Sequence, residues 1–249
     1  LDTAVRRVLF AKFAMGLFED PYGKTFKNRK RHSPESVKLA KTIADESTVL
    51  LKNENQLLPL DAKSLKSIAI IGPNADQVQF GDYTWSRNNK DGVTPLQGIK
   101  NRVNKNTAIH YAKGCSLTSL DTSGIAEAVE AAKNSEVAVI FGGSASAALA
   151  RDYKSSTCGE GFDLNDLNLT GAQSQLIREV YRTGTPVILV LVTGKPFVIE
   201  WEKNNLPAIL VQWYAGEQAG NSIADILFGE VVPSGRLTFS FPRSTGHLP

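Results

Sequence analysis

Short apolar runs alternate with amphipathic stretches along most of the chain. Seven runs rich in branched aliphatic residues have the length of strands, and they lie at 48–51, 67–71, 108–111, 137–141, 186–192, 208–213 and 237–241. Five stretches have the spacing or the end signals of helices, and they lie at 34–46, 94–103, 122–134, 171–183 and 217–228. The run from 187 to 192 is apolar without interruption, as a parallel strand covered on both faces requires. The pattern predicts an α/β fold, with an open, mostly parallel sheet sandwiched between helices.

The first 33 residues follow a different pattern. Residues 1–17 have apolar positions at helical spacing with no N-cap before them, so the chain is expected to open within a helix. Residues 18–33 combine turn formers with a basic run and are expected to form an exposed linker. Ser33 and Pro34 are typical of an N-cap and a first helical position, which predicts that a compact domain occupies 34–249.

Composition and charge narrow the classes of partner. The 249 residues are 42% hydrophobic, which is enough for a sizeable core. Lys and Arg number 28 against 25 Asp and Glu, and the net charge of +3 is too dispersed for a nucleic-acid surface. No apolar run approaches the roughly 20 residues of a membrane span, so no membrane partner is expected. The first residues do not decide export, and the compartment stays open, with a periplasmic or secreted location among the options.

Several kinds of chemistry find little support in the sequence. The turn at 72–76 follows a strand but lacks the glycine spacing of a nucleotide site, so a tight turn is the preferred interpretation. No Gly-x-Ser-x-Gly elbow occurs, and His32, His110 and His247 are not grouped with carboxylates at ligand spacing. We therefore expect no metal and no cofactor. Cys115 and Cys158 could equally be buried thiols or a bridge.

The segments that leave the strands are where an open α/β sheet binds ligands. Three of them stand out, at 72–86, 142–170 and 213–220. The second is long and irregular, which favours function over mere connection. Within it Glu160 lies between two glycines and can project from the backbone into a cleft, although an isolated loop carboxylate is more often a surface residue.

Residues 159–173 carry a Gly-Glu-x-x-Asp signature followed by Leu-x-Leu-x-x-x-Gln. This segment resembles the acid/base loop of glycoside hydrolase family 3, the β-glucosidase and β-xylosidase family. Other segments are similar to that family in the same order, and they are 17–22, 44–53, 57–60, 70–76, 94–99, 214–220 and 233–238. Their collinearity over nearly the whole chain identifies it as resembling the C-terminal α/β-sandwich domain, with 1–17 resembling the last helix of the N-terminal barrel.

The resemblance implies a function and a division of the catalytic residues between two domains. Glu160 would be the general acid/base for retaining hydrolysis of the nonreducing-end β-glycosidic bond in a gluco- or xylo-configured oligosaccharide or aryl β-glycoside. The nucleophilic Asp would come from the barrel domain, so this chain alone is expected to lack it. An ionised carboxylate cannot donate a proton, so Glu160 is expected to depend on desolvation by the barrel and the sugar.

The resemblance also implies substrate-binding residues. Tyr83 and Trp85 follow a glycine turn in a loop that reaches the active-site mouth in the family, although both could instead pack against the sheet. Asp163 belongs to the same signature as Glu160. Leu164 departs from the Arg that many members carry there, so that charged contact is in doubt. Trp213, Tyr214 and Glu217 are expected to have structural roles.

Two rival hypotheses stay open at this point. The isolated piece could be a catalytically silent carbohydrate-binding domain. Alternatively, the chain could be an unrelated nucleotide-binding α/β protein.

Overall fold

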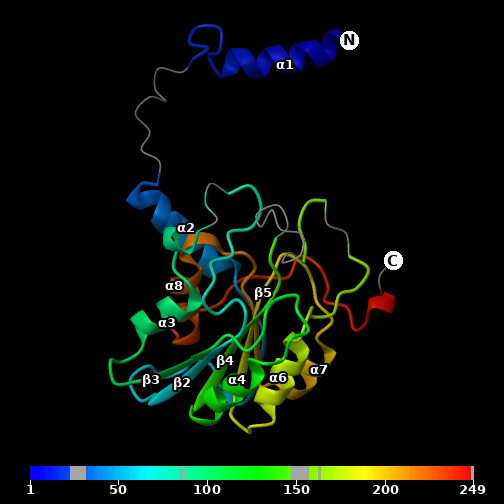
Figure 1. Ribbon diagram of the computed structural model, residues 1–249. Helices are drawn as coiled ribbons and strands as arrows, with labels where there is room; N and C mark the ends of the chain where they lie inside the picture. Colours follow the sequence, from blue (N-terminus) through cyan, green and yellow to red (C-terminus); the bar gives the residue numbers. More distant parts are fainter. Residues whose placement is uncertain (23–31, 85, 87, 147–156, 162–163, 248–249) are drawn as a thin grey trace. The chain divides into compact units, whose positions relative to one another are not determined.

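The computed structural model describes residues 1–22, 32–84, 86, 88–146, 157–161 and 164–247 (Figure 1). The chain forms two compact units, Leu1–Val37 and Lys38–Pro249. In the first unit, helix α1 spans Asp2–Ala14 and has no buried residue. Most of the proposed linker, residues 23–31, lies outside the described part.

Helix α2, Pro34–Ser47, begins in the first unit and continues into the second. The backbone amide of Ser36 donates a hydrogen bond of 3.2 Å to Ser33 Oγ. An N-cap side chain satisfies one of the orphan amides of the first turn in this way. The cap expected at Ser33 is confirmed.

One sheet forms the centre of the second unit, and its strands follow the order β1-β6-β5-β4-β2-β3. The strands are β1 Val49–Asn53, β2 Ser67–Ile71, β3 Ala108–Ala112, β4 Val137–Gly143, β5 Val187–Val192 and β6 Ala208–Val211. β1 pairs antiparallel with β6, whereas every other neighbouring pair is parallel. The mostly parallel sheet predicted from the apolar runs is confirmed.

Helices cover both faces of this sheet (Figure 1). One face packs against α4 Ile125–Lys133, α6 Gln173–Tyr181 and α7 Glu200–Asn205, and the other against α3 Pro95–Arg102 and α8 Ala219–Leu227. Successive residues of a strand point to opposite faces. Accordingly, Ile140 and Leu189 join the first core, whereas Val139 and Ile188 join the second. A continuously apolar strand is thus explained by two buried faces.

Two predicted elements differ from the structure. The short helix α7 was not expected, because its six residues carry too few apolar positions to show a helical period. The strand predicted at 237–241 is wrong, since this segment is irregular and joins no strand of the sheet. The chain contacts the sheet region just before this segment, at Gly235, whose amide donates a 3.0 Å hydrogen bond to the Thr48 carbonyl. Phe241 then packs against the core, so the alternating apolar residues serve packing without strand pairing.

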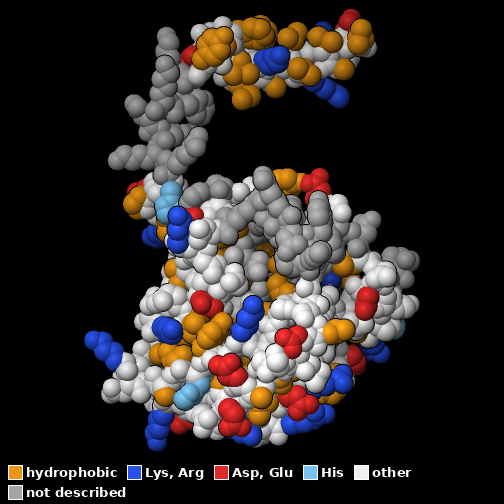
Figure 2. Space-filling model, viewed as in Figure 1, with side chains coloured by type: hydrophobic (Ala, Val, Ile, Leu, Met, Phe, Trp, Pro, Cys, Tyr) orange, Lys and Arg blue, Asp and Glu red, His pale blue; other side chains and the backbone are white. Residues whose placement is uncertain are grey.

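The surface and the two thiols add further detail. Acidic and basic side chains are interspersed on the face of the second unit seen in Figure 2. Cys115 and Cys158 are both buried and both free, so the bridge that the sequence left open does not form. Within the described ranges, none of the helices combines the length and the apolar character needed to cross a membrane.

Candidate functional site

The three segments singled out in the sequence meet beyond the carboxyl ends of the strands. Asn74, fully buried after β2, donates from Nδ2 to the carbonyls of Gly142 and Ser144, each at 3.4 Å. Gln79 Nε2 donates a 2.9 Å hydrogen bond to Asn74 Oδ1, and the Gln79 carbonyl accepts from the Gly216 amide at 3.3 Å. The segments after β2, β4 and β6 are therefore joined into one edge, where an open α/β sheet places its ligands.

The turn that follows β2 requires a glycine, because two backbone segments approach each other closely there. Gly72 has φ +113°, and a Cβ at this position would lie 2.4 Å from the carbonyl oxygen of Phe141. Only glycine tolerates both the backbone conformation and the approach. This supports the tight-turn interpretation over a phosphate cradle.

The loop that carries Glu160 has a fixed base. Thr157 and Ala145 exchange two hydrogen bonds, from the Thr157 amide to the Ala145 carbonyl at 3.0 Å and from the Ala145 amide to Thr157 Oγ1 at 3.1 Å. The next residues, Ser146 and Cys158, form an isolated parallel β-bridge. Two segments that are more than ten residues apart in the chain are thus held side by side at the point where the loop begins.

Glu160 projects from this base into solvent. It is exposed, and Gly159 and Gly161 on either side adopt φ values of +120° and +73°. Residues with side chains rarely adopt these angles, so the two glycines allow the backbone to turn sharply around the carboxylate. The sequence predicted that Glu160 projects into a cleft, and in the structure its side chain is exposed.

Beneath the loop, a chain of hydroxyl and thiol groups links four segments. Tyr214 Oη lies 2.8 Å from Cys158 Sγ and 2.7 Å from Ser144 Oγ. Ser144 Oγ donates to Thr193 Oγ1 at 2.9 Å, and that hydroxyl donates to the Lys195 carbonyl at 2.9 Å. Burial raises the pKa of the Tyr214 phenol, and the nearby Cys158 raises it further, so the phenol stays a hydrogen-bond donor.

The backbone around Tyr214 is built to accept its ring. A Cβ on Gly194 would lie 2.8 Å from Tyr214 Cε2, and one on Gly81 would lie 3.4 Å from Tyr214 Cβ. The preceding residue, Trp213, has φ +58° and donates from its indole nitrogen to the Ser47 carbonyl at 3.1 Å. The predicted strand 208–213 ends earlier, at Val211.

Lys195 places a buried ammonium in the same region. Its side chain is almost fully buried, and no hydrogen bond is found for Nζ among the described residues. Nζ lies 4.9 Å from the centroid of the Phe197 ring. Burial lowers the pKa of Lys195, while the neighbouring Cys158 and Asp166 act in the opposite direction.

Gln173 lies at the C-terminal end of the segment that carries Glu160. Its side-chain oxygen accepts from the Gly143 amide at 2.8 Å, and its nitrogen donates to the Gly143 carbonyl at 3.0 Å. The same nitrogen reaches the carbonyls of Leu117 and Thr170 at 3.2 Å. The glutamine of the recognised motif therefore anchors α6 to the end of β4.

The proposed sugar-binding residues are only partly described. Tyr83 has φ +57° and is 77% exposed, so it does not pack into the core. Trp85 and Asp163 lie outside the described residues. Near Tyr83, Asp82 Oδ1 is buried and has no hydrogen-bond partner in the described part of the chain.

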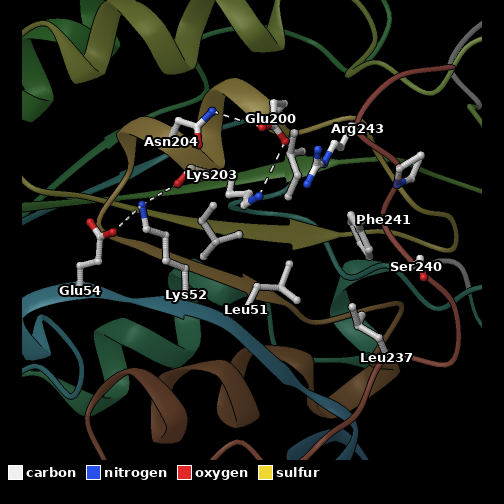
Figure 3. A pocket seen from close by; sticks show the side chains of 13 residues that line it. Leu51, Lys52, Glu54, Glu200, Lys203, Asn204, Leu237, Ser240, Phe241 and Arg243 are labelled. Atoms are coloured by element: carbon white, nitrogen blue, oxygen red, sulfur yellow. Dashed lines mark hydrogen bonds and ion pairs between the residues drawn. The ribbon is translucent and has the colours of Figure 1, made fainter. Parts of the chain in front are cut away.

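A cavity of about 690 Å³ lies away from this edge, between β1, α7 and the segment 237–243 (Figure 3). Four of its five charged side chains form pairs within the cavity wall. Lys52 pairs with Glu54 at 3.1 Å, and Lys203 approaches Glu200 at 3.9 Å. None of the sequence-predicted site residues lines it. Among described residues, no group of three His, Cys, Asp or Glu is arranged to hold a metal ion.

Sequence reasoning identified the Glu160 loop but missed what supports it. It assigned Tyr214 only a general structural role and did not connect Cys158, Ser144 or Lys195 with the loop. The available signal was an aromatic residue at a strand-to-helix junction that follows a buried strand. Only the fold brings residues 144, 158, 193 and 214 together.

The chain is similar in sequence to known proteins over its whole length. The profile of the glycosyl hydrolase family 3 C-terminal domain matches residues 48–249. A β-xylosidase from Formosa agariphila is 40% identical over 256 residues, covering 100% of this chain and 34% of that protein. A periplasmic β-glucosidase from Salmonella typhimurium is 38% identical over 281 residues, covering 100% of this chain and 35% of that protein.

Solved structures show the same fold. A β-glucosidase from Erythrobacter marinus aligns with a TM-score of 0.82 and 34% identity, covering 99% of this chain and 35% of that one. A β-glucosidase from Listeria innocua in complex with isofagomine aligns with a TM-score of 0.80 and 32% identity, covering 98% and 33%. The chain thus spans about a third of the length of these relatives.

Proposed function

The chain belongs to glycoside hydrolase family 3, of which it carries the C-terminal domain, and we propose that its Glu160 is the general acid/base of a retaining β-glycosidase. This membership excludes the unrelated nucleotide-binding protein. The observation that carries the proposal is the position of Glu160, which is exposed between two left-handed glycines on a loop anchored at the carboxyl edge of the sheet.

In the proposed reaction, Glu160 acts twice. Its carboxylic acid protonates the glycosidic oxygen while a carboxylate from the barrel domain attacks the anomeric carbon, which gives a covalent glycosyl-enzyme. Glu160, now ionised, removes a proton from the water that cleaves this intermediate. A retaining pair needs its carboxyl groups about 5–5.5 Å apart, so the barrel domain has to dock against this edge. The substrates proposed are β-glucosides or β-xylosides, after the relatives of both kinds.

The test is Glu160→Ala in the full-length protein that contains this chain. General acid assistance contributes typically about 10²–10⁴-fold, and an activated aryl leaving group needs little of it. The kcat/KM for alkyl glycosides or disaccharides should therefore fall far more than that for dinitrophenyl glycosides, and azide should yield a glycosyl azide of retained configuration. Glu130→Ala, which removes another exposed carboxylate, serves as the control. Equal losses on both substrates without azide rescue would rule Glu160 out.

A second experiment separates this chain from the barrel. The purified 249-residue chain should fold but release no sugar from β-glucosides or β-xylosides, because the nucleophile is proposed to lie elsewhere. Addition of the barrel domain should restore hydrolysis. Binding of oligosaccharide without hydrolysis by the isolated chain would support the carbohydrate-binding alternative for the separate domain. Sugar release that Glu160→Gln abolishes would instead require a nucleophile within this chain.

Tyr83 is proposed to face the sugar, together with Trp85 and Asp163. Aromatic rings offer sugars a flat apolar surface and a polar edge. Because Tyr83 is 77% exposed, Tyr83→Ala should leave the melting temperature nearly unchanged. In the full-length protein it should lower kcat/KM for oligosaccharides by about 1 kcal/mol, or roughly fivefold. A lower melting temperature with unchanged kinetics would place Tyr83 in the framework instead.

A further inference from the structure

Tyr214 is the point where the segments around Glu160 converge. Its hydroxyl reaches Ser144 after β4 and Cys158 at the base of the Glu160 loop. Its ring lies against Gly194 after β5 and Gly81, two residues before Tyr83. One side chain therefore contacts four segments of the candidate site.

The polar contacts of Tyr214 form a continuous chain. One placement of protons satisfies every link, with the Cys158 thiol donating to the Tyr214 oxygen and the phenol donating to Ser144 Oγ. Ser144 then donates to Thr193, and Thr193 to the Lys195 carbonyl. Buried polar groups that are linked in this way polarise one another and hold one arrangement. Without the Tyr214 hydroxyl, the thiol keeps only the longer contact of 3.6 Å from Cys158 Sγ to Ser144 Oγ as its described link to this chain.

We infer that Tyr214 is a positioning residue that sets the place of Glu160 through Cys158. The inference rests on the proposed role of Glu160 as acid/base. Only Gly159 lies between Cys158 and Glu160, so a shift of the Cys158 backbone is passed directly to the carboxylate. Misplacement of a reacting group by about 1 Å can cost about 10²-fold in rate, which gives such an anchor a kinetic effect.

The side chain of Tyr214 allows the hydroxyl and the ring to be tested separately. Tyr214→Phe removes Oη, with its contacts to Cys158 and Ser144, and retains the ring that packs on Gly194. In the full-length protein we expect kcat/KM for alkyl glycosides, which reports the step that needs the proton donor, to fall roughly tenfold or more. The kcat/KM for dinitrophenyl glycosides should change less than about threefold, because formation of the glycosyl-enzyme from these substrates depends little on proton donation. Tyr181→Phe, on α6 and partly exposed, is the matched control and should change neither.

Two further variants examine the route through the thiol. Cys158→Ser keeps a group that can donate and accept, so it should retain most of the activity on alkyl glycosides. Cys158→Ala should resemble Tyr214→Phe. In addition, Tyr214→Phe should speed alkylation of Cys158 in the native protein, measured by peptide mass spectrometry, while that of Cys115 stays unchanged. Cys115 is a suitable reference because burial raises its pKa to about 11.

A double-mutant cycle separates positioning from general support. If Tyr214 acts through Glu160, Tyr214→Phe should add no further loss in a Glu160→Ala background. Equal losses on both substrate classes, or losses that add in the double variant, would overturn the positioning role while leaving Glu160 as acid/base. Absence of any leaving-group effect in Glu160→Ala would instead overturn the proposed function itself.

Discussion

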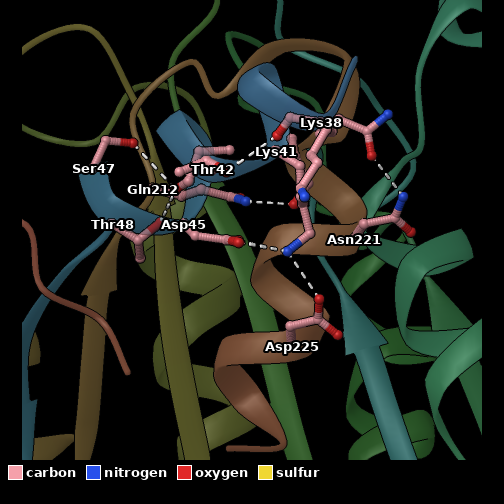
Figure 4. Close-up of polar contacts among 12 residues, drawn as sticks. Lys38, Lys41, Thr42, Asp45, Ser47, Thr48, Gln212, Asn221 and Asp225 are labelled. Atoms are coloured by element: carbon pink, nitrogen blue, oxygen red, sulfur yellow. Dashed lines mark hydrogen bonds and ion pairs between the residues drawn. The ribbon is translucent and has the colours of Figure 1, made fainter. Parts of the chain in front are cut away.

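Lys41 on α2 joins two carboxylates, one on its own helix and one on α8 (Figure 4). Its ammonium lies 2.7 Å from Asp45 and 2.8 Å from Asp225. Its side chain is 21% exposed, so the cluster is largely shielded from water. Farther along α2, the Ser47 carbonyl accepts the indole hydrogen of Trp213, the residue before Tyr214. We predict that Lys41→Met destabilises the chain, because it leaves two carboxylates without their shared cation.

The expected magnitude follows from this geometry. Two unit charges 4 Å apart attract by about 1 kcal/mol in water and about 4 kcal/mol at an effective dielectric constant near 20. Desolvation of the ammonium and up to about 2 kcal/mol of lysine rotamer entropy oppose this gain. With partial exposure, about 0.5–1 kcal/mol remains for each pair, or about 1–2 kcal/mol in total. For a domain of this size the melting temperature should fall by about 2–8 °C.

Urea unfolding followed by tryptophan fluorescence measures the change. The matched control is Lys133→Met, which removes an exposed pair with Glu130 at 2.7 Å and should cost less than about 0.5 kcal/mol. Burial lowers the pKa of Lys41, but hydrogen bonds and charges of Asp225 and Asp45 outweigh it, so the pKa is raised overall. The stabilisation is therefore complete below the ordinary lysine value of 10.5 and is lost as pH rises through the folded-state value. Equal unfolding free energies for the two variants at neutral pH would refute this reasoning.

Two more substitutions test the packing and the buried charge. Lys195→Met should stabilise the chain by about 1–2 kcal/mol at pH 7, since it removes a buried ammonium for which the described residues provide no hydrogen bond. Burial lowers the pKa of Lys195, so the unfolded chain binds more protons than the folded chain. The gain in unfolding free energy from Lys195→Met should therefore shrink as pH rises toward 10.5. A gain that grows with pH in urea unfolding would contradict this prediction. Gly98→Ala should cost more than about 2 kcal/mol despite the better helix propensity of alanine, because the new Cβ would lie 2.0 Å from the Gly220 carbonyl oxygen where α3 crosses α8. A melting temperature equal to that of the parent would show that these helices can separate freely.

Hydrophobic periodicity alone determined most of the architecture. An uninterrupted apolar run such as Val187–Val192 needs two covered faces, and this requirement is local enough to be seen in the residues themselves. The cap at Ser33 is equally local. The segment 237–241 misled the same reasoning, because alternating apolar residues pack against a core without forming a ladder. Backbone pairing depends on a free neighbouring strand, which periodicity does not reveal.

The candidate site also has one part that the sequence predicts and one part that it does not. Glu160 was found in the sequence because its signature is contiguous and its flanking glycines follow from the backbone angles required there. Its support by Tyr214, Cys158 and Ser144 was not found, because these residues lie up to 70 positions apart. Parallel strands bring their carboxyl ends to one edge whatever the distance along the chain, and hydrogen bonds then form between the segments that leave them. The resemblance of one contiguous motif to a known family therefore determined which carboxylate to propose, whereas only the tertiary structure decided what holds it in place.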